Sequence, residues 1–220
     1  MCGRFALYSS YPRLSQALRL SLSQPDLELV PRYNVAPGTW ITGVWHQGPD
    51  TGPAFGQLWW GYRPAWAKEG APQPINAKVE TVATSRFFQA AFRRHRCLIP
   101  ADGWFEWLPT EDGKQPYYLS RRDREPLFLA GIWAERIDGS PGCAILTEPA
   151  RGAAREIHDR MPLALNEASL EPWLDPDLTD RETIRQVVRH LDAVHIEHWP
   201  VSRAVNKPGE GQGAVLINPA

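Results

Sequence analysis

Cysteine is scarce in this sequence. Its 220 residues include three cysteines, Cys2, Cys97 and Cys143, widely spaced and without a Cys-x-x-Cys pair. This pattern argues against a disulfide framework and against a thiolate zinc site, so we expect reduced cysteines. His195 and His198 are three residues apart in a segment that reads as a strand, where odd spacing places them on opposite faces. We therefore expect no metal and no cofactor.

Long hydrophobic runs are also missing. The chain has no stretch of about 18 apolar residues that could cross a bilayer. Its N-terminus lacks the basic segment followed by an apolar segment that marks a signal peptide. We therefore expect a cytoplasmic protein that makes no membrane contact.

Net charge is close to zero, because 24 Lys and Arg residues face 25 Asp and Glu residues. That balance alone argues against an obligate nucleic-acid binder. The charges are unevenly distributed along the chain, since the net formal charge of Trp59–Leu98 is +5 and that of Glu148–Glu182 is −5. We expect the basic stretch to be available to phosphate and the acidic stretch to face solvent. Ten tryptophans are unusually many, and Trp59, Trp60 and Trp66 lie in the basic stretch, an arrangement that can stack unpaired bases.

The length suits one domain over residues 1–220, and 43% apolar with 22% charged residues predicts a folded chain. Apolar periodicity and capping residues predict helices at Tyr11–Gln24, Ser85–Arg94 and Thr179–Asp192, and a helical turn at Leu170–Leu174. Short apolar runs between turn residues predict strands at Thr39–His46, Phe55–Tyr62, Cys97–Ala101, Trp104–Leu108, Pro116–Ser120, Leu127–Glu135, Cys143–Thr147 and His195–Val201. The first two strands are expected to form a hairpin, and Gly209–Gly213 a late flexible loop. We predict an α+β fold: a single compact domain of curved antiparallel β-sheets, barrel-like, with peripheral helices.

The second residue is the most informative one. Cys2 follows the initiator Met1, and a side chain this small permits removal of Met1, which would make Cys2 the N-terminal residue. An α-amine titrates at about 7.7–8.0 and a thiol at about 8.5, so part of the amine is neutral at cytosolic pH. Such a 1,2-aminothiol traps aldehydes, because the amine forms a Schiff base and the thiol then closes a five-membered thiazolidine on the same carbon.

Six segments occur in an order that resembles the SRAP family, the SOS-response-associated peptidases: Met1–Phe5, Tyr33–Pro37, Trp60–Ala67, Ile75–Thr81, Arg96–Trp107 and His158–Pro162. The resemblance covers almost the whole chain. It implies a sensor of abasic sites in single-stranded DNA that crosslinks itself to the lesion through the N-terminal cysteine and shields it from strand cleavage. It also implies a DNA groove across the active site, self-processing of Met1, binding at single-strand/duplex junctions and association with the nucleoid. We expect a monomer.

The resemblance carries the family's catalytic residues onto Cys2, Asn76, Glu106 and His158. A histidine with a pKa of about 6.5 can protonate the ring oxygen as the abasic sugar opens to its aldehyde, and we assign this step to His158. Glu106 is flanked by aromatic residues, and an apolar setting raises a carboxyl pKa to where the group both takes and gives a proton. Asn76 would orient the sugar or the Cys2 amine without titrating.

The same resemblance implies DNA contacts at Arg4, Asn34, Pro37, Trp66, Lys78, Arg86 and Arg160. The four cations are candidates for phosphate, while Pro37 and Trp66 match positions that wedge or stack against bases. Lys78 stands where the family has an arginine, so the bidentate fork is lost and a lower affinity is expected.

Two other functions stay open on the sequence. Glutamine amidotransferases with an N-terminal nucleophile also begin Met-Cys-Gly, but their later Arg-Gly-Pro-Asp is missing here, because His46–Asp50 lacks the arginine. Alternatively, the chain could bind single-stranded DNA without covalent chemistry, and Cys2 would then be incidental. A glutaminase assay tests the first alternative, and intact mass after exposure to abasic DNA tests the second.

Overall fold

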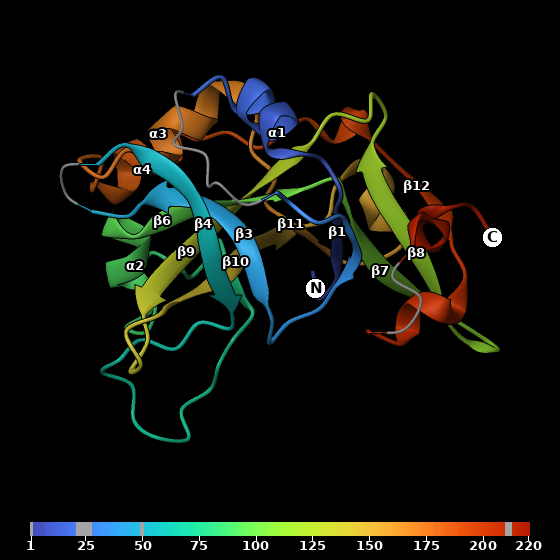
Figure 1. The fold of residues 1–220 in the computed structure, drawn as a ribbon, viewed down its shortest axis with the longest axis horizontal. Helices are drawn as coiled ribbons and strands as arrows, with labels where there is room; N and C mark the ends of the chain where they lie inside the picture. Colours follow the sequence, from blue (N-terminus) through green and yellow to red (C-terminus); the bar gives the residue numbers. More distant parts are fainter. Residues whose placement is uncertain (1, 21–27, 49–50, 210–212) are drawn as a thin grey trace.

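A computed structural model describes residues 2–20, 28–48, 51–209 and 213–220 of the chain (Figure 1). In chain order, the strands of these residues are β1 (Phe5–Leu7), β2 (Arg32–Val35), β3 (Trp40–His46), β4 (Pro53–Trp60), β5 (Asn76–Lys78), β6 (Arg96–Ala101), β7 (Gly103–Thr110), β8 (Gly113–Arg121), β9 (Leu127–Glu135), β10 (Pro141–Pro149), β11 (Arg160–Pro162) and β12 (Ile196–Pro200). They form a five-stranded sheet in the order β12-β8-β7-β1-β2 and a seven-stranded sheet that holds the others.

The larger sheet closes on itself. Its neighbours run β10-β4-β3-β6-β9, and β9 also pairs with β10, which completes the ring. Most pairs are antiparallel, whereas β4 and β5 run parallel to β10. The interior is filled by aliphatic side chains such as Leu58, Ile99 and Ile145, all fully buried. The predicted α+β class with curved, barrel-like sheets is confirmed, with two parallel pairings in addition.

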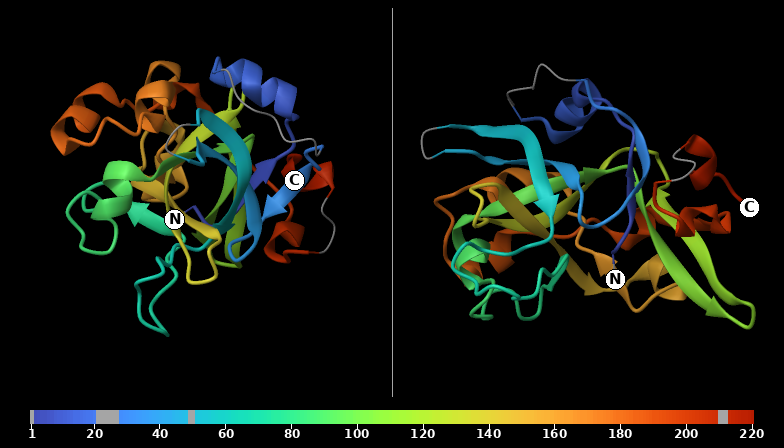
Figure 2. Two further views of the ribbon diagram at one scale, coloured as in Figure 1. Left: turned by 60° about the vertical axis from the view of Figure 1, so that its left-hand side comes forward. Right: turned by 60° about the horizontal axis from the view of Figure 1, so that its bottom comes forward.

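The N-terminal strand belongs to the smaller sheet and packs against the larger one. β1 pairs with β7 in the smaller sheet, with Phe5 opposite Trp104. The ring of Phe5 packs on Trp60 of the larger sheet, with their centroids 5.2 Å apart. The Asp102 carboxylate, buried between β6 and β7, accepts the backbone N–H groups of Tyr8 and Ser9 at 2.6 and 2.8 Å. These contacts hold the start of the chain in the middle of the fold (Figure 2).

The helices are shorter than the sequence predicts. α1 (Tyr11–Leu18) ends because Arg19 adopts a left-handed conformation with φ 51°. α2 (Gln89–Arg94) begins after a run of turns rather than at Ser85. α4 (Arg181–Val187) is capped by the Asp180 side chain, which accepts the N–H of Thr183. No helix of the described residues is long and apolar enough to cross a membrane.

Other elements follow the prediction. α3 (Leu170–Leu174) matches the predicted helical turn, and β3 and β4 form the predicted hairpin, from Trp40 opposite Trp59 to His46 opposite Pro53. β1, β2, β5 and β11 were not predicted. Residues 21–24 of the expected first helix and 210–212 of the expected Gly209–Gly213 loop lie outside the described residues.

Two charged residues correct the predicted charge distribution. Arg96, counted in the basic stretch, is only 4% exposed and donates to the carbonyls of Phe92, Arg93, Trp173 and Asp175 at 2.5–3.0 Å. Glu148, counted in the acidic stretch, is buried and pairs with Arg151 at 2.7 Å. Each is paired inside the protein, so neither belongs to the surface that its stretch was expected to form.

Arg96 should therefore matter more for stability than for ligand binding. Arg96→Met leaves four carbonyl groups at the ends of α2 and α3 without their donor, which should lower the free energy of unfolding by about 3–5 kcal/mol. Urea denaturation measures this change. Arg94→Met, on the exposed side of α2, is the matched control and should stay within about 0.5 kcal/mol of the parent. Equal effects of the two substitutions would contradict a structural role for Arg96.

Candidate functional site

The pairing of β1 with β7 brings Cys2 close to Glu106. The Phe105 N–H donates to the Arg4 carbonyl at 2.9 Å, and the same register continued by one residue sets Gly3 opposite Glu106. The Cys2 side chain is completely buried. Burial raises the pKa of its thiol, and the negative charge of Glu106 raises it further. The thiol therefore stays protonated until a nearby base removes its proton.

Asn76 reaches the same place from the other sheet. It opens β5, which lies beside β10 with Asn76 opposite Ile145. The indole N–H of Trp60 donates to the Ile75 carbonyl at 3.0 Å and so fixes the preceding residue. The Asn76 amide Nδ2 donates to the Cys2 carbonyl at 2.9 Å. The two sheets thus meet at Cys2.

Glu106 and His158 line one cavity of about 750 Å³, together with Arg4, Trp107, Lys114 and Asp159 among others. Glu106 is 3% exposed, and burial raises its pKa to about 7. A carboxyl group with that pKa both accepts and donates protons near neutral pH. The aromatic setting anticipated from the sequence has the expected consequence for this side chain.

His158 lies between the 3₁₀ turn η1 (Gly152–Glu156) and β11, and two groups compete for its Nδ1 atom. The Arg160 N–H donates to Nδ1 at 2.9 Å, while the Asp159 carboxylate Oδ1 lies 2.8 Å from the same nitrogen. The first contact requires a bare Nδ1 and the second a protonated one. Burial lowers the pKa of His158, and the Asp159 charge opposes that shift. The sequence analysis missed Asp159, whose only signal is its place next to His158.

Arg4 and Asn34 form a buried pair beside the cavity. The Arg4 guanidinium donates to Asn34 Oδ1 at 2.7 Å and to the Val205 carbonyl at 2.8 Å, and it lies 5.8 Å from the Trp107 ring centroid. Asn34 is buried and its amide also donates to the Val205 carbonyl. The Asn34 side chain holds Arg4 in place, and its direct contact with DNA stays a prediction.

Arg160 is less accessible than expected for a phosphate contact. Its side chain is 13% exposed and forms a two-pronged ion pair with Glu80, at 2.5 and 3.0 Å. It also donates to the Thr147 carbonyl at 2.6 Å. In this structure Arg160 braces the segment that carries His158, and its contact with a DNA phosphate stays a prediction.

The remaining predicted contacts lie at the surface. Lys78 and Arg86 are exposed, Pro37 is half-buried, and Trp66 is 66% exposed with its ring edge-on to Phe87 at 5.7 Å. These positions are compatible with binding a ligand from outside.

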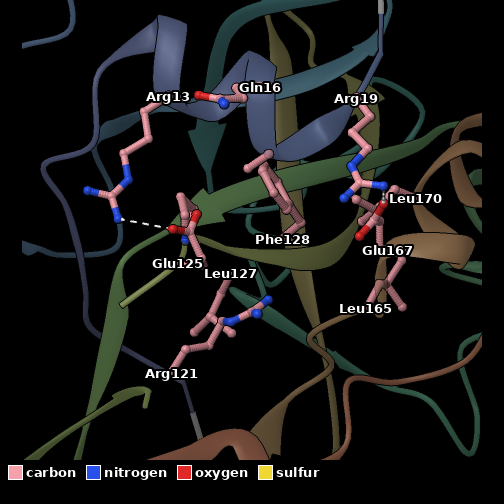
Figure 3. A pocket seen from close by; sticks show the side chains of 12 residues that line it. Arg13, Gln16, Arg19, Arg121, Glu125, Leu127, Phe128, Leu165, Glu167 and Leu170 are labelled. Carbon is pink, nitrogen blue, oxygen red and sulfur yellow. Dashed lines mark ion pairs between the residues drawn. The ribbon is translucent and has the colours of Figure 1, made fainter. Parts of the chain in front are cut away.

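A second cavity, of about 590 Å³, lies under α1 and is shown in Figure 3. Its arginines are engaged by carboxylates: Arg13 with Glu125 at 3.7 Å and Arg19 with Glu167 at 2.5 Å. The described residues that line it include none of the predicted site residues. Within the described ranges there is also no group of three or more His, Cys, Asp or Glu side chains placed to hold a metal ion.

Comparisons with known proteins identify the family. The family model of the SOS response associated peptidases (SRAP) matches residues 1–208. The chain is 36% identical over 226 residues to the abasic site processing protein YedK of Escherichia coli, covering 100% of both, and 32% identical over 215 residues to the abasic site processing protein YoqW of Bacillus subtilis, covering 94% and 95%.

Solved structures show the same fold. A phage-related protein of Bordetella bronchiseptica superposes with a TM-score of 0.74 at 33% identity, covering 92% of this chain and 95% of that one. A protein of Bacteroides thetaiotaomicron superposes with a TM-score of 0.82 at 19% identity over the whole of both chains, a likeness of fold alone. By its sequence match and its structure, this chain belongs to the SOS response associated peptidase family.

Proposed function

We propose that this protein binds single-stranded DNA at abasic sites and forms a covalent crosslink with the lesion through Cys2. The observation that carries the proposal is a chain of contacts among residues from four separate parts of the chain. Asn76 donates to the Cys2 carbonyl, the charge of Glu106 acts on the Cys2 thiol, and Glu106 lines one cavity with His158. Its relatives are named abasic site processing proteins, which favours the same substrate here.

The proposed reaction needs no oxidant or reductant. After Met1 is removed, the Cys2 amine attacks the aldehyde carbon of the opened abasic sugar, and loss of one water gives an imine. The thiol then adds across the C=N bond: sulfur bonds to carbon and its proton moves to nitrogen. The product is a thiazolidine that joins the protein to DNA and shields the lesion from strand cleavage.

Glu106 is suited to the proton transfers between amine, carbinol oxygen and thiol, because its pKa of about 7 lets it act in both directions. Asn76 holds the Cys2 carbonyl and so orients the nucleophile. His158 would protonate the sugar ring oxygen through Nε2. The Asp159 carboxylate stabilises the doubly protonated ring that this step requires, because it accepts from Nδ1 when that atom carries a proton.

We further propose that the protein acts as a monomer in the cytoplasm, joins the nucleoid when bound to DNA and accepts single-strand/duplex junctions. Removal of Met1 by the protein itself is part of the proposal, in keeping with the family's description as a peptidase.

Incubation with an abasic single-stranded oligonucleotide, followed by denaturing electrophoresis, tests the proposed function. We expect a band that survives heat and detergent, and no such band with the undamaged oligonucleotide. Binding without a durable band would favour the noncovalent alternative. Glutamine hydrolysis without any DNA adduct would favour the amidohydrolase.

The exposed cations should make binding of undamaged single strands depend on salt. Arg86→Ala should reduce the slope of log affinity against log salt by roughly one counterion. Arg122→Ala is the control. Arg122 is also exposed, and it follows β8 at the end of the strand opposite Lys114, a residue that lines the cavity. Fluorescence anisotropy at several salt concentrations measures both slopes. If the affinity of the parent for undamaged single strands does not change with salt, the exposed cations do not bind DNA phosphates.

A further inference from the structure

Two tryptophans meet at the surface where β3 begins and β4 ends. The register sets Trp40 opposite Trp59, and their rings pack edge-on with centroids 5.6 Å apart. The Trp40 side chain is 43% exposed. The guanidinium of Arg136 lies 5.1 Å from the centroid of the Trp59 ring. We refer to Trp40, Trp59 and Arg136 as the tryptophan platform.

The platform is not part of the barrel interior. Trp60, the next residue after Trp59, is completely buried and packs on Phe5. Successive strand residues point to opposite faces of a sheet, so Trp59 and its partner Trp40 point away from that interior. Tryptophan offers one of the largest apolar surfaces of any side chain, and leaving it in water forgoes the favourable free energy of burial. Such exposure is typical of a surface that a ligand covers.

Backbone hydrogen bonds connect the platform to the segments of two residues expected to touch DNA bases. On one side Pro37 is three residues before Trp40, and the intervening Gly38 N–H donates to the Trp60 carbonyl at 2.9 Å. On the other side the Ala65 N–H donates to the Glu135 carbonyl at 2.8 Å. This hydrogen bond joins Ala65, which precedes Trp66, to Glu135, which precedes Arg136.

The ribbon shows the same arrangement. In Figure 1 the ends of β4 and β9 and the loop between β4 and β5 gather at one side of the molecule, at the lower left. The platform also connects to the candidate site, because Trp60 donates its indole N–H to the carbonyl just before Asn76. Backbone hydrogen bonds therefore tie the segments of Pro37 and Trp66 to the strands that carry the platform.

We propose that the tryptophan platform is a stacking site for an unpaired base of the single strand that flanks the lesion. Every nucleobase has an aromatic face, so an exposed indole binds any sequence, as a lesion sensor requires. Arg136, whose guanidinium also lies 3.6 Å from the exposed Asp138 carboxylate, adds a positive charge beside the rings, which suits the phosphates on either side of that base. The inference rests on the proposed function, because it places the platform along the same DNA strand.

Strand length provides the test. Binding of undamaged oligonucleotides of about 5 and about 15 nucleotides is measured for the parent and for Trp40→Ala. We expect Trp40→Ala to weaken binding of the longer strand by about tenfold and to leave the shorter strand unchanged, since one stacked base is lost. Trp40→Phe keeps an aromatic face and should recover most of the loss. Val194→Ser, at another exposed apolar residue, is the control and should bind as the parent does.

Arg136→Gln provides a second test of the platform, because it removes the positive charge and leaves both indole rings in place. It should lower affinity for the longer strand and reduce the salt slope by about one counterion. Crosslinking of the parent and Trp40→Ala to a short abasic oligonucleotide is followed in parallel. If both proteins crosslink equally but Trp40→Ala binds the longer strand more weakly, the result supports the platform. If neither protein crosslinks, the result counts against the proposed function, and the comparison of strand lengths still tests the platform.

Two results would overturn the inference. The first is that Trp40→Ala and Arg136→Gln both bind the longer strand with the affinity of the parent. The other is a parent protein that sediments as a dimer and becomes monomeric on Trp40→Ala without a change in DNA affinity, because a second copy of the chain would then be the occupant.

Discussion

Cys2→Ala should reduce the durable crosslink to abasic single-stranded DNA by about 100-fold or more, because the variant keeps an α-amine but has no thiol to close the ring at high effective concentration. The amine can still form an imine, which water reverses. Borohydride should therefore trap an adduct of the variant that is not seen without reductant. Denaturing electrophoresis with and without borohydride measures both effects.

Two controls isolate the thiol of the first residue. Cys2→Ser preserves the size of the side chain and its tolerance of Met1 removal, and it should behave like Cys2→Ala because a hydroxyl closes a less stable ring. Cys143→Ala removes a buried thiol inside the barrel and should crosslink like the parent. A Cys2→Ala adduct as abundant and as heat-stable as that of the parent, formed without reductant, would rule out the thiazolidine.

Glu106→Gln should slow crosslinking by about 10²–10⁴-fold, the usual contribution of a general acid–base group. The loss should persist with an open-chain aldehyde attached to DNA, which needs no ring opening. His158→Ala, in contrast, should slow the natural hemiacetal far more than the open-chain aldehyde. Single-turnover rates for the two substrates measure this difference, and equal slowing of both substrates by both variants would show that the two residues share one step.

The raised pKa of Glu106 also predicts how the stability of Glu106→Gln relative to the parent changes with pH. Folding raises this pKa from 4.5 to about 7, so the folded state binds the proton more tightly and the parent loses stability as pH rises through that interval. Glutamine does not titrate. The stability of Glu106→Gln relative to the parent should therefore increase between about pH 4.5 and 7 and level off above. Glu111→Gln, in the exposed β7–β8 turn, is the matched control, and a trend of equal size in both variants would contradict this assignment.

The parts of the fold that the sequence predicts well are the long strands. β9 is a continuous apolar run bounded by turn residues, and the predicted bounds Leu127–Glu135 agree with the structure. β1, β5 and β11 have three residues each, too few for a periodicity, and they exist because partners across the sheet supply their hydrogen bonds. The first helix is shorter than its apolar pattern because the backbone turns left-handed at Arg19.

The candidate site shows a similar division. Cys2, Asn76, Glu106 and His158 are far apart in sequence, and no spacing rule connects them; only the resemblance to a family did so. Side-chain accessibility could not be predicted from charge or composition, since Arg96 and Arg160 are held by carbonyls and by Glu80 within the protein. The tryptophan platform likewise depends on the strand register, which decides that Trp40 and Trp59 share a face.

Intact mass spectrometry of the protein after reaction with an abasic oligonucleotide tests the central claim most directly. The account predicts an adduct equal to the chain without Met1 plus the oligonucleotide minus one water, stable without reductant, with the DNA located on the peptide that begins at Cys2. An adduct without loss of water, one that retains Met1, or one located on an internal lysine would contradict it.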